Sequence, residues 1–81
     1  MRKTAWKPAI VVEDPQSGTR TTVRTVRQAF KTLHDHWPDT SGSRYRLADH
    51  VCDEVLHGHL EPAEARKAFI AAAIEAHLHL G

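Results

Sequence analysis

The stretch from residue 62 to residue 77 constrains the fold more than any other part of the chain. Pro62 suits the first position of a helix, and Glu64 suits the positive end of the helix dipole. Ile70 and Ile74 widen an apolar stripe of small alanines and one phenylalanine. We therefore predict a buried core helix at about residues 62–77. The stripe recurs at helical spacing and consists of Ala65, Ala68, Phe69, Ala72, Ala73 and Ala76.

Two short segments near the start of the sequence predict a β-hairpin at about residues 9–24. The first, residues 9–13, is rich in β-branched side chains. A turn with Pro and Gly follows it, and residues 19–24 form the return strand. Alternation along that strand places Arg20, Thr22 and Arg24 on one face and Thr21 with Val23 on the other. Residues 1–8 are expected to form a flexible N-terminal arm.

Capping signals predict two more helices between the hairpin and the core helix. Thr25 and Gln28 form a capping box, and a proline ends the helix that they begin. Ser43 is a candidate N-cap for the next helix, and Gly58 suits the left-handed position at its end. These signals predict helices at about residues 26–37 and 44–57.

The order of the elements predicts an α+β domain at residues 9–81. We expect an N-terminal two-stranded antiparallel β-hairpin followed by three α-helices packed around one core. The segment from Leu78 to Gly81 has two interpretations, a fraying helix end or a short extended tail that packs its two leucines. The expected core residues are Phe30, Leu33, Trp37, Tyr45, Cys52, Leu56, Ala65 and Phe69.

Composition excludes several classes of protein. The 81 residues suit one domain, and 11 Lys and Arg against 10 Asp and Glu leave a net charge of +1. That balance alone does not indicate nucleic-acid binding. A single cysteine, Cys52, excludes an intramolecular disulfide and a cysteine-based zinc site. No stretch has the length of a signal peptide's apolar region or of a membrane span, so we expect a cytoplasmic protein without a membrane partner.

A set of motif residues occurs in the order and spacing of a known family. They are Trp37-Pro38, Gly42, Tyr45, Ala48, Cys52, Gly58, Ala65-Arg66 and Ala68-Phe69-Ile70. From the hairpin through the last helix, the chain resembles a small bacterial family, the domain of unknown function numbered nine-eight-two. The resemblance implies a stand-alone bacterial protein of about eighty residues, with no activity, substrate or cofactor to carry over.

The resemblance also directs attention to Arg66, beside the apolar stripe. An arginine there can lay its stem on apolar surface and turn its guanidinium to a carboxylate of the preceding helix. Asp49, Asp53 and Glu54 are the candidates. We expect a structural ion pair of Arg66 with Asp53, and a ligand-binding arginine is the alternative.

No constellation of side chains predicts catalysis or metal binding. Cys52 lies on the apolar face of its helix, where a thiol is inert. His50, Glu54, His57 and His59 come nearest to a metal set, but His50 and His57 lie two helical turns apart, too far for one zinc ion. We predict no enzyme, no catalytic residue, no metal site and no cofactor, with the histidines solvated at the surface.

Two surfaces are candidates for binding. Arg20, Arg24, Arg27 and Lys31, with His34, form a basic face that suits a nucleic-acid-binding accessory protein. Ile70 and Ile74, together with the open edges of the hairpin, suit self-association as a homodimer or an unknown protein partner. We favour a non-catalytic protein-interaction module, with nucleic-acid binding as the alternative. A monomer whose Leu78–Leu80 tail covers the isoleucines is the competing interpretation.

Overall fold

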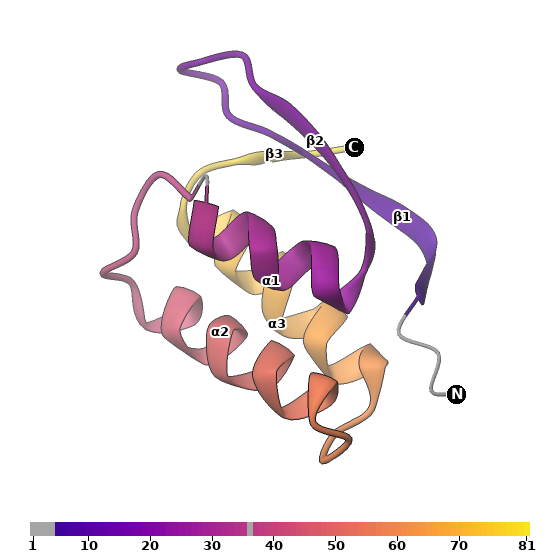
Figure 1. The fold of residues 1–81 in the computed structure, drawn as a ribbon. Helices are drawn as coiled ribbons and strands as arrows, with labels where there is room; N and C mark the ends of the chain where they lie inside the picture. Colours follow the sequence, from indigo (N-terminus) through magenta and orange to yellow (C-terminus); the bar gives the residue numbers. More distant parts are fainter. Residues whose placement is uncertain (1–4, 36) are drawn as a thin grey trace.

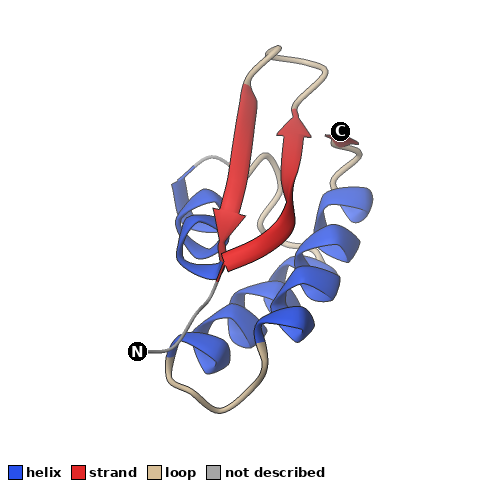
Figure 2. Ribbon diagram, turned by 90° about the vertical axis from the view of Figure 1, so that its right-hand side faces the viewer, coloured by secondary structure: helices blue, strands red, loops and turns tan. Residues whose placement is uncertain are grey.

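The computed structural model of the chain describes residues 5–35 and 37–81. Figure 1 shows three helices grouped on one side of the strands, with the tip of the hairpin extending beyond them. Figure 2 shows the strands from the open side of the sheet. The α+β class and the three helices are therefore as predicted. The elements are β1 (Ala5–Glu13), β2 (Arg20–Thr25), α1 (Val26–Asp35), α2 (Ser43–Leu56), α3 (Pro62–Glu75) and β3 (His79–Leu80).

The sheet has three antiparallel strands in the order β2-β1-β3, so the prediction of a two-stranded hairpin was incomplete. β3 pairs with the end of β1, where Val12 lies opposite Leu80. Val11 and Gly81 exchange backbone hydrogen bonds of 3.4 and 2.9 Å beside this pair. Of the two interpretations of the C-terminal segment, the extended tail is therefore the one observed, but it packs only one of its two leucines: Leu78 packs against the core, whereas Leu80 is 40% exposed. A two-residue strand is too short to show a period in the sequence.

The predicted arm of residues 1–8 is wrong from Ala5 onward, because β1 begins there. Trp6 is only 6% exposed, and its indole N–H donates to the carbonyl of Pro62, 3.1 Å away. That bond joins the start of β1 to the first turn of α3. Residues 1–4 lie outside the described residues.

The core lies between the sheet and the three helices, with Phe69 at its centre. Phe69 is fully buried, as the apolar stripe of α3 predicts. Three of the expected core residues are only partly buried and pack around its rim: Phe30, Tyr45 and Leu56. The other five are buried: Leu33, Trp37, Cys52, Ala65 and Phe69.

The first helix begins as the capping box predicts, with one difference. The hydroxyl of Thr25 accepts the backbone N–H of Gln28 at 3.1 Å. The Gln28 side chain accepts the backbone N–H of Arg24 at 2.6 Å, one residue before the expected donor. At the end of α2, Gly58 has the left-handed backbone angle φ of 81° that its predicted position requires.

The start of α2 differs from the prediction, because Ser43 is not its N-cap. Gly42 occupies the cap position, and it has no side chain with which to cap. Glu75, at the end of α3, supplies the missing acceptor: its carboxylate accepts the N–H groups of Arg44 and Tyr45 at 3.1 and 3.2 Å. A Cβ on Gly42 would lie 1.9 Å from Oε2 of Glu75, so glycine leaves room for the carboxylate. A contact 30 residues distant gives no local sequence signal.

Candidate functional site

The one cysteine is not placed for nucleophilic chemistry. Cys52 is fully buried, and burial, with a smaller contribution from the charge of Asp49, raises the pKa of its thiol to about 12. A thiol with so high a pKa carries almost no thiolate near neutral pH. Within residues 5–35 and 37–81, no group of three or more His, Cys, Asp or Glu side chains is arranged to hold a metal ion. None of the three helices is both long enough and apolar enough to cross a membrane.

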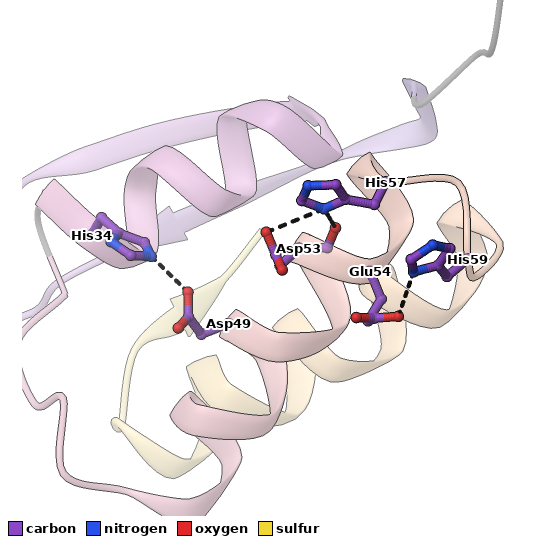
Figure 3. A network of polar contacts seen from close by, with 6 residues as sticks. All are labelled: His34, Asp49, Asp53, Glu54, His57 and His59. Atoms are coloured by element: carbon purple, nitrogen blue, oxygen red, sulfur yellow. Dashed lines mark hydrogen bonds and ion pairs between the residues drawn. The ribbon is translucent and has the colours of Figure 1, made fainter.

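Three of the histidines are paired singly with carboxylates of α2 (Figure 3). His34 of α1 lies 2.6 Å from Asp49 and links the two helices. In the other two pairs the histidine lies just beyond the end of α2, and the nitrogen–oxygen distances are 3.4 and 2.9 Å. All three histidine side chains are 48–64% exposed, so each pair is worth little to stability. The pairs at the end of α2 are His57 with Asp53 and His59 with Glu54.

The structure does not form the predicted ion pair of Arg66 with Asp53. Arg66 turns toward β1, where it donates to the Pro8 carbonyl and lies 5.9 Å from the centroid of the Trp6 ring. Asp53 pairs with His57 instead. The prediction failed because it assumed that residues 5–8 were a loose arm. With β1 packed at this place, a carbonyl and an aromatic face are nearer than α2.

The residues of the predicted basic face are all exposed, but three of the five already have carboxylate neighbours, among them His34, which pairs with Asp49. Arg20 lies 3.7 Å from Glu13, and Lys31 lies 3.2 Å from Asp35. Among the ion pairs between described residues, none involves the other two, Arg24 and Arg27. The local positive charge is therefore concentrated where β2 passes into α1.

The two residues of the predicted isoleucine surface both lie on α3, but they differ in exposure. Ile70 is partly buried against the core, whereas Ile74 is 62% exposed. Ile74 is the most exposed of the large hydrophobic residues described, the others being Leu47, Leu60 and Leu80 at 37–45%. β3 runs along β1 and leaves Ile74 uncovered.

Two small cavities lie near the turn of the hairpin and share Asp14 in their walls. The first, about 120 Å³, lies between the hairpin and Trp37, whose buried indole N–H has no hydrogen-bond partner among the residues that the structure describes. The second, about 260 Å³, is bordered by Asp39 and Glu75 as well as Asp14. The hydroxyl and backbone N–H of Ser41 lower the pKa of Asp39. The first lining holds Ser17 but no histidine, and the second holds His77 but no serine, threonine or cysteine, so neither has the arrangement of a Ser–His or Cys–His pair.

Comparison with known proteins gives one result. No curated protein and no solved structure matches the chain. The family model described as "Protein of unknown function (DUF982)" matches residues 7–80, a range that includes nearly all of β1 and every later element. This is the family that the motif residues of the helices resemble. The chain therefore belongs to the DUF982 family.

Proposed function

We propose that the protein is a non-catalytic interaction module that self-associates through the exposed face of α3. The observation that carries the proposal is the exposure of Ile74, which is 62% accessible in the last turn of α3. The competing interpretation, a monomer whose tail covers the isoleucines, loses support because β3 is committed to pairing with β1. Burial of Ile74 against a partner would contribute about 1–2 kcal/mol for each copy.

The charges around this face suit a second copy of the same chain. Lys67 and Glu64 lie on the outer side of α3 and pair at 3.7 Å, so the face carries no net charge. In an antiparallel two-fold pairing of α3 about residues 70 and 71, the stem of Lys67 lies beside Ile74 of the second copy. A small residue at the centre, Ala71, allows the two helices to approach closely.

The hairpin edge is a less suitable surface for self-association. A two-fold pairing of β2 with itself about Thr22 places Arg20 opposite Arg24 of the second copy, and like charges directly opposite are destabilising. This repulsion favours α3 over β2 as the dimer interface.

The test is the mass in solution by light scattering across a hundredfold range of concentration. The native protein should rise from 9.1 kDa toward twice that value. Ile74→Lys should keep the monomer mass throughout. Leu60→Lys is the matched control, because Leu60 is exposed but precedes α3, whose first residue lies about 18 Å along the helix from Ile74. A native mass that stays at 9.1 kDa, or an equal effect of the two substitutions, would contradict the proposal.

A further inference from the structure

We infer that the outer edge of β2 binds an extended acidic segment of another protein, which adds to the sheet as a further strand. This inference goes beyond self-association through α3 and concerns a separate surface. Three observations carry it. They are the direction in which the backbone N–H and C=O groups of β2 point, the hydrogen bond by which the Gln28 side chain occupies the last outward N–H of this edge, and the placement of two arginines.

The backbone of β2 alternates between bonding to β1 and facing outward. Asp14 donates to Thr19 at 2.9 Å, and the register continues with Glu13 opposite Arg20 and Val11 opposite Thr22. In an antiparallel ladder, hydrogen-bonded and non-bonded pairs alternate. The N–H and C=O groups of Arg20 and Thr22 therefore point away from β1. β2 is the outer strand of the described sheet, so no strand lies beyond it to receive them (Figure 2).

The free edge ends at Arg24. Its N–H also points outward, and the side-chain oxygen of Gln28 accepts it at 2.6 Å. That oxygen stands where the carbonyl of a neighbouring strand would lie. Four backbone groups, two each on Arg20 and Thr22, remain for a partner, which is the number that two residues of an antiparallel strand satisfy.

The side chains at this edge select for acidic partners. Arg20 and Arg24 are exposed on the solvent face of the sheet, four residues and about 13 Å apart, with Thr22 between them. An added strand presents alternate side chains to the same face, so carboxylates four residues apart would lie beside the two arginines. Arg20 is free to change partners, because its contact with Glu13 is 3.7 Å long and joins side chains that are 69% and 39% exposed.

A second copy of this chain does not fit the edge. The described strands carry one acidic residue, Glu13 on β1, and no pair at the required spacing. Pairing of β2 with itself brings arginines together. A nucleic acid would meet the same positive charge, but its phosphates only accept hydrogen bonds and would leave the outward carbonyls of Arg20 and Thr22 without donors. An experiment can separate the two classes of partner.

The experiment measures fluorescence anisotropy of a labelled peptide, Thr-Val-Glu-Val-Thr-Val-Glu-Val-Thr, titrated with the full-length protein. Two derivatives are N-methylated on alternate residues, one on the glutamate and threonine positions and the other on the valine positions. Only the amides of one set can face β2. We expect saturable binding, weakened at least tenfold by methylation of that set and about unchanged by the other.

Paired variants test the arginines. Arg20→Ser with Arg24→Ser should weaken binding at least tenfold, whereas Arg44→Ser with Arg46→Ser, an equal change of charge on α2, should leave it within about twofold. Ile74→Lys should bind the peptide as the native protein does, so this inference and self-association can fail separately. Circular dichroism checks that each variant is folded.

Three results would overturn the inference. They are no saturable binding of the peptide, equal losses from the two methylation patterns, and equal losses from the two pairs of arginine variants. Binding of a single-stranded oligonucleotide without binding of the peptide would also overturn it and would favour the nucleic-acid alternative.

Discussion

Two tryptophans pack against Phe69, and their polar atoms have different surroundings. The ring centroids of Trp6 and Trp37 lie 5.8 and 5.4 Å from that of Phe69, and the two residues are 6% and 8% exposed. The indole N–H of Trp6 donates to the Pro62 carbonyl. The indole N–H of Trp37 is buried without a hydrogen-bond partner among the described residues. Equal burial therefore does not mean an equal contribution to stability.

The difference reflects what each tryptophan joins. Trp6 fixes β1 to the first turn of α3, and Arg66 lies over its ring while donating to the Pro8 carbonyl. Trp37 follows α1 and packs between Phe69 and Tyr45, beside a cavity of about 120 Å³. A buried donor without a partner costs about 1–3 kcal/mol. Trp6 is therefore held by polar and apolar contacts together, whereas Trp37 itself is held by the packing of its ring.

The largest expected effect comes from removal of the ring that the two tryptophans share. Phe69→Ala should lower the free energy of unfolding by about 3–5 kcal/mol, because Phe69 is fully buried and its loss leaves a cavity between two indoles. Urea unfolding followed by tryptophan fluorescence measures the change. Leu47→Ala, an exposed position on α2 away from the proposed interface, is the control and should change stability by less than about 1 kcal/mol. Equal stability of the Phe69→Ala and native proteins would show that Phe69 is not the centre of the core.

The next effect separates the two tryptophans. Trp6→Phe should lower the free energy of unfolding by about 1–2 kcal/mol more than Trp37→Phe does. The first substitution removes a hydrogen bond, whereas the second removes a buried donor that has no partner among the described residues. The two substitutions delete the same atoms, so the loss of ring area largely cancels in the comparison. Urea unfolding of the two variants gives the difference. A larger cost for Trp37→Phe would mean that its N–H has a partner in solution.

The helices and the hairpin could be predicted from the sequence because their signals are local. The capping residues Thr25 and Gln28, the glycine at 58 and the alanine stripe of α3 each act within a few residues of the element that they define. The packing of Trp6, the capping of α2 by Glu75 and the third strand could not be predicted in this way. Each depends on contact between segments that are far apart in the sequence.

The candidate surfaces were predictable to different degrees. The exposure of Ile74 follows from an apolar stripe too wide for one side of a helix, and the alternation of β2 correctly placed Arg20 and Arg24 on one face. The hydrogen bond from Arg24 to Gln28, which ends the free edge, required the observed geometry. The partner of Arg66 was mispredicted because the strand that supplies it was not expected.

The smallest expected effect tests whether the ionisation of Tyr45 affects Trp37 and leaves Trp6 unaffected. Its hydroxyl donates to the Leu33 carbonyl at 2.9 Å, and its ring lies 6.4 Å from that of Trp37. Burial, and then the negative charge of Asp49, raises the pKa of Tyr45 above its usual 10.0. The unfolded chain therefore ionises first, so the stability contributed by the neutral phenol is present below pH 10 and is lost as the pH rises through the folded-state pKa.

Variants with a single tryptophan report the ionisation of Tyr45 separately at Trp6 and at Trp37, through the tryptophan emission. We expect the emission of Trp37, observed in Trp6→Phe, to fall above pH 10 while the protein is still folded, because tyrosinate forms beside it. The emission of Trp6, observed in Trp37→Phe, should stay nearly constant over the same range. Both proteins should carry Cys52→Ala, since the Cys52 thiol, with a pKa raised to about 12, titrates in this region too. Tyr45→Phe should abolish the change at Trp37, and an equal response from the two tryptophans would show that the alkaline transition is global and not confined to one side of the core.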